Sequence, residues 1–239
     1  MSGVLPRGGP RGGLRVAVVD YGAGNLVSIE QALTFVGADV RVATGADDLL
    51  DAEAIVVPGV GAAGPAMNRL ARAGLVDPLL RWIALGRPYL GICLGLQLLF
   101  DASDEDGAAT FGVIPGRSVL LADAPTLPHI GWNQVERRRD HHLFAGIDQA
   151  ADLYFVHSYA GRPEGAGADA VTLAETEHGS RFVSAIDRGN VLGVQFHPER
   201  SGGTGLRILG NFTRWATALA AGAGAERSPV GAGGTAGGD

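Results

Sequence analysis

The stretch Pro88–Phe100 constrains the fold of this chain more than any other, because it changes character around the only cysteine. Before Cys93, the residues Tyr89, Leu90 and Ile92 are typical of the end of a buried strand. After it, the apolar residues of Leu94–Phe100 predict a short helix. The sequence therefore places Cys93 on a turn from strand to helix.

Two glycines, Gly91 and Gly95, lie two residues to either side of Cys93. This Gly-x-nucleophile-x-Gly spacing is that of a nucleophile elbow, a turn too tight for a side chain at either glycine. A helix N-terminus would also favour the thiolate form of Cys93. The alternative is that a lone cysteine is a small buried hydrophobic side chain, and the stretch alone leaves both interpretations open.

Composition limits the classes of function. The chain has 239 residues, of which 46% are hydrophobic, enough for one or two domains with a sizeable core. A net charge of -6 argues against general nucleic-acid binding. One cysteine cannot form an internal disulfide, which suits a cytoplasmic location. No apolar run approaches the roughly 18 residues that span a membrane.

The ends of the chain differ from its middle. Residues 1–13 are predicted to be a flexible extension that is rich in glycine, proline and arginine. Residues 222–239 are predicted to be a disordered tail of glycine and alanine. We expect a single folded domain over residues 14–221.

Within this domain, apolar runs alternate with helical stretches up to Phe100. This alternation predicts an α/β fold with a mostly parallel, doubly wound sheet flanked by helices. Beyond Phe100 the chain is expected to add one strand over Asp152–Tyr159 and a final helix from about Gly205 to Ala220. An antiparallel meander is predicted over Val171–Ala174, Arg181–Ile186 and Val191–Phe196.

Sites in such sheets form at the carboxyl ends of the strands. Cys93 lies at one such end and the turn Pro58–Gly61 at another, where backbone N–H groups could approach a substrate oxygen. An ordinary glycine turn is the alternative for Pro58–Gly61. The glycine-rich turn Asp20–Asn25 lacks the dinucleotide fingerprint because Val27 replaces its third glycine. We therefore expect no cofactor.

A nucleophilic cysteine needs a base, and the base needs a group that orients it. His197 ends a predicted strand, and Glu199 follows after Pro198, which fixes the local backbone. This arrangement suits an imidazole whose tautomer is set by a carboxylate. His141 and His142 lie in a charged loop and are expected to be solvated. The histidines and the single cysteine have no standard zinc spacing, so no metal is expected.

Two motifs, Gly91–Gln97 and Gly193–Glu199, resemble those of the class I (triad) glutamine amidotransferases. Within that family the chain is similar to the glutaminase subunits of imidazole glycerol phosphate synthase. Further segments carry this narrower resemblance, which runs from about Leu14 to Ala218: Asp20–Asn25, Pro58–Gly61, Pro128–Asn133 and Tyr154–Tyr159. The chain departs from the pattern at Ala63, where an aromatic is usual, and at Arg200, where lysine is commoner.

The resemblance implies a flavodoxin-like fold and a Cys-His-Glu triad. Cys93 would be the nucleophile, His197 the general base and Glu199 the group that orients His197. The oxyanion would accept hydrogen bonds from backbone N–H groups of Leu94 and of the Val60 and Gly61 region. L-Glutamine would be held by further side chains, namely Gln97, Ser158, Tyr159 and Glu105.

The resemblance also implies a partner. Such subunits form a heterodimer with a (β/α)8-barrel cyclase subunit, which uses the ammonia to make imidazole glycerol phosphate and AICAR in L-histidine biosynthesis. The residues expected at that interface are His129, Trp132, Asn133, Tyr154 and Arg200.

Three alternatives remain open from the sequence. The chain could be an amidotransferase of another pathway, such as pyridoxal phosphate or anthranilate synthesis. It could be a stand-alone γ-glutamyl hydrolase that needs no partner. It could be a non-catalytic binding module, although the intact Cys93, His197 and Glu199 argue against this.

Overall fold

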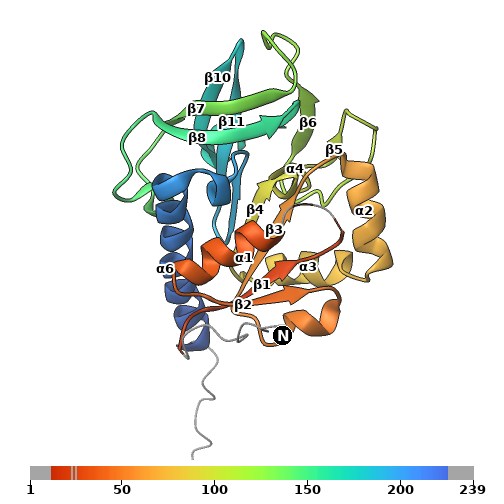
Figure 1. Ribbon diagram of the computed structural model, residues 1–239. Helices are drawn as coiled ribbons and strands as arrows, with labels where there is room; N and C mark the ends of the chain where they lie inside the picture. Colours follow the sequence, from red (N-terminus) through yellow and green to blue (C-terminus); the bar gives the residue numbers. More distant parts are fainter. Residues whose placement is uncertain (1–11, 23, 25, 226–239) are drawn as a thin grey trace, which may run out of the picture.

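A computed structural model describes residues 12–22, 24 and 26–225 (Figure 1). Most of the predicted N-terminal extension, residues 1–11, and most of the predicted tail, residues 226–239, lie outside the described residues. The last helix, α6 (Gly202–Ala225), starts earlier and ends later than its predicted span. It takes up residues 222–225, which the sequence assigned to the tail.

One nine-stranded sheet organises the domain, and the order of its strands confirms the predicted α/β class. Neighbouring strands are parallel from β2 to β12 and antiparallel from β12 to β8. In sheet order the strands are β2 (Asp39–Ala43), β1 (Arg15–Val19), β3 (Ala54–Gly59), β4 (Tyr89–Cys93), β12 (Val191–Val194), β11 (Ser180–Arg188), β10 (Thr172–His178), β7 (His129–Arg137) and β8 (Ala151–His157).

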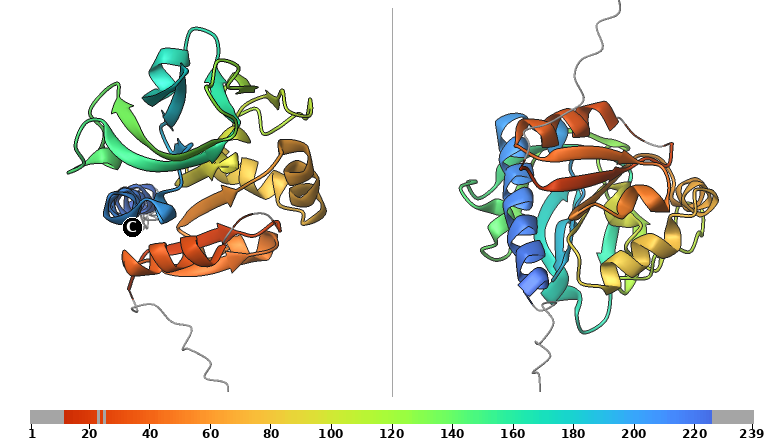
Figure 2. Two further views of the ribbon diagram at one scale, coloured as in Figure 1. Left: turned by 45° about the horizontal axis from the view of Figure 1, so that its top comes forward. Right: turned by 90° about the horizontal axis from the view of Figure 1, so that it is seen from below.

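Helices cover both faces of the parallel half of the sheet (Figure 2). One face packs on α1 (Leu26–Phe35) and α6, and the other on α2 (Ala63–Arg72) and α3 (Val76–Ala84). Strand β1 shows why: Val16 and Val18 join the first core, whereas Ala17 and Val19 join the second. A strand buried on both faces needs a continuous apolar run, which is the pattern of these segments.

Strand β12 completes the predicted antiparallel meander of β10, β11 and β12 and adds a pairing that the sequence did not predict. It pairs antiparallel with β11, as expected, but parallel with β4 on its other side. From β12 the antiparallel part of the sheet continues through β11, β10 and β7 to β8. The pairing with β4 matters for the site, because it sets the strand that leads to His197 beside the strand that ends in Cys93.

The segment predicted as one strand, Asp152–Tyr159, is divided between two sheets. Strand β8 ends at His157, and β9 (Tyr159–Pro163) joins a three-stranded sheet with β6 (Gly116–Leu120) and β5 (Ala102–Ser103). The chain turns at Ser158, whose carbonyl accepts a hydrogen bond from the Leu121 N–H at 3.0 Å. The strand-like pattern of residues 152–159 is continuous, so it does not indicate that the chain changes sheets at Ser158.

The prediction that His141 and His142 are solvated is wrong for His141, whose side chain is 9% exposed, whereas His142 is exposed. His141 Nε2 lies 3.3 Å from a carboxylate oxygen of Asp187, and the His142 ring stacks on Trp215 with 5.3 Å between centroids. Asp187 belongs to β11, whereas Trp215 belongs to α6, on which the short helix η2 (His142–Phe144) packs. One histidine of the charged loop is thus packed into the fold, and the other is stacked on α6 at the surface.

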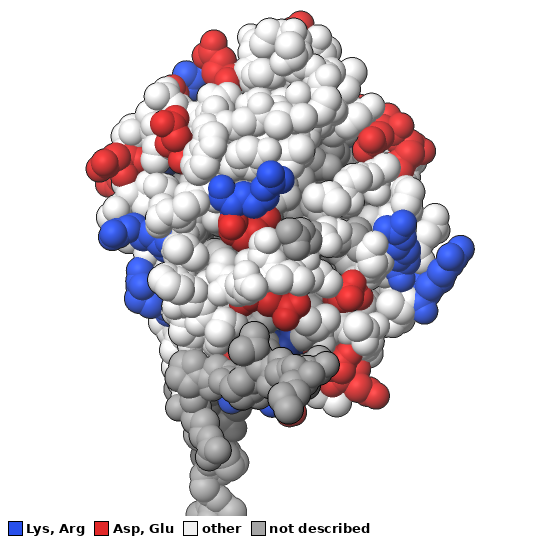
Figure 3. Space-filling view, viewed as in Figure 1, with Lys and Arg blue, Asp and Glu red and all other residues white. Residues whose placement is uncertain are grey.

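The surface carries both signs of charge. On the face shown in Figure 3, acidic and basic side chains are interspersed rather than gathered into one basic patch. Of the helices that the structure describes, none has the length and apolarity to cross a membrane.

Candidate active site

Cys93 lies at the end of β4, on the turn into the short helix α4 (Leu94–Gln97). Its φ of 53° is in the left-handed region, a strained conformation for a residue with a side chain. A Cβ on Gly91 would stand 2.4 Å from the Gly95 carbonyl oxygen, and one on Gly95 would stand 1.8 Å from that of Val57. Both glycines are therefore required sterically, as the elbow predicts.

Helix α4 is shorter than the predicted helix over Leu94–Phe100. The chain leaves the helix after Gln97, and the N–H groups of Val113 and Ile114 both donate to the Leu99 carbonyl at 2.9 Å. A single helical turn has a small dipole. Its support for the thiolate is correspondingly weaker than the sequence suggested.

The turn after β3 lies directly beside the elbow. Gly59 is opposite Cys93 in the β3–β4 register, so Val60 and Gly61 follow at the level of the thiol. Val60 is 45% exposed and Gly61 has a φ of +89°. The two predicted sources of oxyanion donors, this turn and Leu94 on the elbow, thus lie at the same edge of the sheet.

His197 and Glu199 form a buried pair at the end of β12. His197 Nδ1 lies 2.8 Å from a carboxylate oxygen of Glu199, and both side chains are under 10% exposed, at 6% and 8%. Because Nδ1 faces the carboxylate, Nε2 is the nitrogen left for Cys93; among the described residues it has no hydrogen-bond partner. Burial acts to lower the pKa of His197, but Cys93 and Glu199 outweigh it and raise the pKa above 6.5.

Gln195 is a site residue that the sequence reasoning missed. It is fully buried, and its amide nitrogen donates to Cys93 Sγ at 3.5 Å. Its amide oxygen accepts a hydrogen bond from Gln97 Nε2 at 3.1 Å. The sequence did contain a signal for Gln195. Side chains alternate between the two faces of a strand, and Gln195 and His197 alternate with the apolar residues Val194 and Phe196, so Gln195 is expected on the same face as His197.

A cavity of about 170 Å³ opens beside the thiol. Its walls include all the predicted oxyanion and glutamine residues except Leu94, together with Pro128 and the end of β8, which no prediction assigned to it. The predicted residues that line it are Val60, Gly61, Cys93, Gln97, Glu105, Ser158 and Tyr159.

The polar side chains of this cavity differ in whether they are already hydrogen-bonded within the protein. Gln97 is 5% exposed, and its amide nitrogen already donates to the Tyr159 carbonyl at 2.7 Å as well as to Gln195. It therefore holds the wall in place. Glu105 is exposed at the rim, and burial together with Asp106 raises the pKa of its carboxyl.

The predicted interface residues fall into two groups. Trp132 is 57% exposed and meets Tyr154 edge to face at 6.1 Å, and the Arg200 guanidinium lies 4.1 Å from the centre of the Tyr154 ring. His129, in contrast, is 4% exposed, so it is not a contact residue of the surface. Asn133 points its amide nitrogen toward His129 Nε2 at 3.2 Å.

His129 belongs to a buried histidine pair with His157. His129 Nδ1 and His157 Nε2 are 3.1 Å apart, and His157 Nδ1 donates to the Tyr159 carbonyl at 2.9 Å. Consequently the His157 Nε2 accepts, and His129 donates to it. Burial lowers the pKa of His129 to about 4 and that of His157 to about 3, so both rings are neutral near pH 7.

Trp132, Tyr154 and the Arg200 guanidinium form an exposed aromatic group at the surface. This group is connected to the predicted triad through the backbone of Tyr154. The His197 N–H donates to the Tyr154 carbonyl at 2.8 Å, and the Tyr154 N–H donates to Ser201 Oγ at 3.0 Å. Ser201 in turn donates to the His197 carbonyl at 2.7 Å. A displacement of Tyr154 would therefore move His197. Within the residues described, no group of three or more His, Cys, Asp or Glu side chains could hold a metal ion.

Known proteins are similar to this chain over most of its length. Residues 17–215 match the family described as glutamine amidotransferase class-I. The imidazole glycerol phosphate synthase subunit HisH of Symbiobacterium thermophilum is 46% identical over 203 residues, which cover 84% of this chain and 93% of that protein. The same subunit of Aquifex aeolicus is 43% identical over 208 residues, covering 86% and 99%.

Solved structures agree on the fold. A glutamine amidotransferase crystal structure superimposes with a TM-score of 0.66 at 20% identity and covers 86% of this chain and 98% of its own. PurLQS from Thermotoga maritima gives a TM-score of 0.66 at 18% identity, with coverage of 85% and 99%. The chain belongs to the class-I glutamine amidotransferase family and, within it, to the HisH subunits of imidazole glycerol phosphate synthase.

Proposed function

We propose that this chain is the glutaminase subunit that supplies ammonia for imidazole glycerol phosphate synthesis in L-histidine biosynthesis, and that Cys93, His197 and Glu199 carry the reaction. One observation carries the proposal. The register of β3, β4 and β12 sets the thiol, a carboxylate-bound imidazole and the Val60–Gly61 turn at one edge of the sheet, beside a cavity.

The first half of the reaction forms a thioester. His197 accepts the thiol proton, and Cys93 Sγ attacks the side-chain amide carbon of glutamine. The oxyanion of the tetrahedral intermediate accepts hydrogen bonds from the Leu94 N–H and from the Val60–Gly61 turn; losing one such donor typically costs about 3 kcal/mol. The C–N bond breaks as His197 returns its proton to the leaving nitrogen, and ammonia departs.

The second half regenerates the enzyme. His197 removes a proton from water, the hydroxide attacks the thioester carbon, and the C–S bond breaks to release glutamate. Glu199 holds the imidazole so that the same Nε2 serves in both halves. Gln195 donates to the sulfur that carries negative charge at the beginning and end of the cycle.

The glutamine itself fits the walls of the cavity in a defined orientation. Its α-amino group would lie toward Glu105, the carboxylate at the rim. Its amide end would lie toward Cys93, between the Val60–Gly61 turn and the Ser158–Tyr159 corner.

Ammonia must reach a second active site, which is in the cyclase subunit, a (β/α)8 barrel. The exposed aromatic group is the candidate docking face for that subunit. Trp132 and Tyr154 are on the antiparallel strands β7 and β8, and Arg200, on the short helix η3 (Pro198–Arg200), lies over the Tyr154 ring. Aromatic and arginine side chains are typical interface anchors. The backbone bonds from Tyr154 to His197 and Ser201 give docking a direct path to the triad. His129 and Asn133 support this face from beneath.

The test is Cys93→Ala in a complex with the cyclase subunit. We expect glutamine-dependent synthesis to be abolished and ammonia-dependent synthesis by the partner to be retained. Wild-type chain alone should turn over glutamine more slowly than the complex. Persisting glutamine-dependent synthesis in the variant would exclude Cys93 as the nucleophile, and full glutaminase rate without the partner would favour a stand-alone hydrolase.

A further inference from the structure

The turn before α1 packs against the turn that follows β3. Gly22 N–H donates to an Asp20 carboxylate oxygen at 2.8 Å, and Arg69 of α2 donates to the Gly22 carbonyl at 3.0 Å. These bonds fix the Asp20–Gly22 segment to the body of the domain. Gly24 lies beside Gly59, since a Cβ on Gly24 would stand in van der Waals contact with the Gly59 Cα, at 3.7 Å.

Tyr21 approaches Gly59 from a second direction. A Cβ on Gly59 would stand 1.9 Å from the Tyr21 hydroxyl oxygen, so the hydroxyl occupies the space that any side chain at position 59 would need. Gly59 is the residue opposite Cys93 and directly precedes Val60. The Tyr21 hydroxyl therefore lies against the backbone at the start of the turn that carries the proposed oxyanion donors.

This hydroxyl is buried and unpaired. Tyr21 is 5% exposed, and its hydroxyl has no hydrogen-bond partner in the part of the chain that the structure describes. Buried polar groups are nearly always paired, because leaving one unpaired costs free energy. Burial, with Cys93 nearby, raises the pKa of Tyr21 well above 10, so the hydroxyl keeps its proton and can donate.

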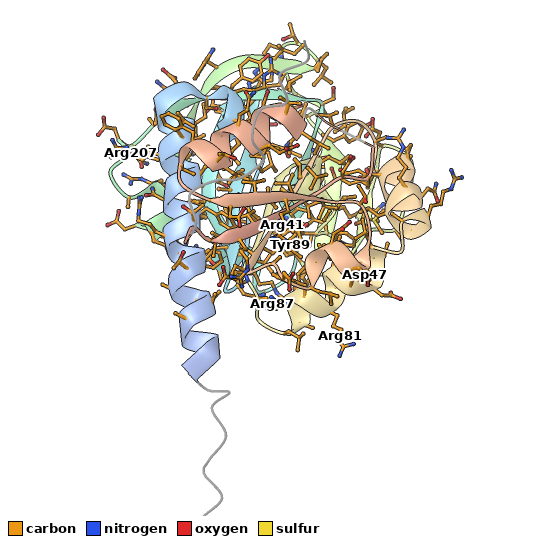
Figure 4. The ribbon with its side chains drawn as sticks, turned by 60° about the horizontal axis from the view of Figure 1, so that its bottom comes forward. Arg41, Asp47, Arg81, Arg87, Tyr89 and Arg207 are labelled. Carbon is orange, nitrogen blue, oxygen red and sulfur yellow. The ribbon has the colours of Figure 1, made fainter. Side chains whose placement is uncertain are left out.

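Tyr89, in the same region, is a buried tyrosine whose hydroxyl does have a hydrogen-bond partner. It is fully buried inside the body of the molecule, whereas Arg81 lies at the edge (Figure 4). Its hydroxyl lies 3.4 Å from the Gly95 carbonyl of the elbow. One buried tyrosine thus contacts the elbow backbone, and the other contacts the neighbouring turn without a bond.

We propose that Tyr21 is a positioning residue for the oxyanion turn. Its hydroxyl hydrogen-bonds the backbone of the Gly59–Val60 peptide when Val60 and Gly61 present their N–H groups to the tetrahedral intermediate. The bond is made in the transition state and not in the resting fold, and it therefore favours the reactive orientation of the turn. This inference rests on the proposed glutaminase reaction and adds a residue to it.

The test is Tyr21→Phe in the complex with the cyclase subunit. We expect kcat for glutamine to fall about tenfold, which corresponds to about 1.4 kcal/mol, with KM within about twofold of wild type. The melting temperature should be unchanged or higher, because the hydroxyl that is removed has no bond in the resting fold. Alkylation of Cys93 by iodoacetamide should proceed at the wild-type rate.

Thr176→Val is the matched control, since Thr176 also buries an unpaired hydroxyl but lies on β10, away from the turn. It should leave kcat at the wild-type value. An unchanged kcat in Tyr21→Phe would overturn the positioning role, and so would a fall in kcat that is matched by a lower melting temperature. Absence of glutaminase activity from the wild-type complex would instead overturn the proposed function, and this inference with it.

Discussion

At the scale of single residues, the site separates groups that act on the reacting atoms from groups that hold substrate. Glu199 is 8% exposed and bonded to His197, whereas Glu105 is exposed at the rim of the cavity. In the proposed reaction the first carboxylate sets the tautomer of the base, and the second would offer its charge to the substrate. Two residues of the same type therefore have different expected effects on catalysis.

Glu199→Gln should lower kcat for glutamine by about a hundredfold with little change in KM, because a neutral amide stabilises the protonated imidazole less than a carboxylate and its NH2 group can favour the wrong tautomer. Glu105→Gln should raise KM by about fivefold at nearly constant kcat, since an exposed charge contributes modestly to binding. Steady-state kinetics of both variants in the complex give the comparison. If Glu105→Gln lowered kcat instead, the substrate role of Glu105 would be wrong.

At the scale of elements, two turns at neighbouring strand ends make the site, and their backbones touch. The β3–β4 register aligns Gly59 with Cys93, and the elbow glycines allow the strands and α4 to pack this closely. The geometry is thus set by backbone atoms that no side chain can replace. Replacing an elbow glycine by alanine tests whether the site depends on this close packing of the backbone.

Gly95→Ala should abolish glutamine hydrolysis and lower the free energy of unfolding by about 3 kcal/mol, because its Cβ would overlap the Val57 carbonyl. Gly210→Ala is the control: Gly210 lies within α6, and a Cβ there would make only ordinary contacts, the nearest at 3.5 Å to Arg214. It should raise stability by up to about 1 kcal/mol. Urea unfolding measures both, and a stable, active Gly95→Ala would contradict the elbow geometry.

At the scale of the whole molecule, the antiparallel half of the sheet lies above the parallel half, which carries Cys93 (Figure 1). The antiparallel half carries the surface aromatic side chains of Trp132 and Tyr154 and the buried pair of His129 and His157. His157 lines the cavity, and His129 is hydrogen-bonded to His157. Their burial couples the stability of the fold to pH.

Stability should fall as the pH drops from about 6.5 toward 4. The unfolded chain binds protons at these histidines near pH 6.5, whereas the folded chain does so only near their lowered pKa values, about 4 for His129 and about 3 for His157. For His157 alone the loss at pH 5 is about 2 kcal/mol, since one pH unit is worth about 1.4 kcal/mol. His197 has a raised pKa and acts in the opposite sense, stabilising below pH 6.5 and losing its contribution as the pH rises through its folded pKa.

Urea unfolding at about pH 7.5 and about pH 5 checks this, with His157→Gln as the comparison. The difference in unfolding free energy between the two pH values should be smaller in the variant than in wild type. An equal difference would mean that His157 does not control the acid response.

The sequence by itself determined the parts of this protein that depend on local patterns. Continuous apolar runs specified the buried parallel strands, the glycine spacing specified the elbow around Cys93, and the strand end before Pro198 specified the carboxylate-bound base. Each depends on residues that are close in the chain, so periodicity and turn chemistry were sufficient. The family resemblance added the roles of these residues.

Tertiary structure alone decided what depends on strand pairing and on contacts between distant segments. The corner at Ser158, the parallel pairing of β12 with β4, the contact between His129 and His157 and the hydrogen bond from Gln195 to Cys93 are examples. The Tyr21 hydroxyl against Gly59 joins residues 38 positions apart in the same way. Register and packing fix these contacts, and a single sequence read along its length carries no direct record of either.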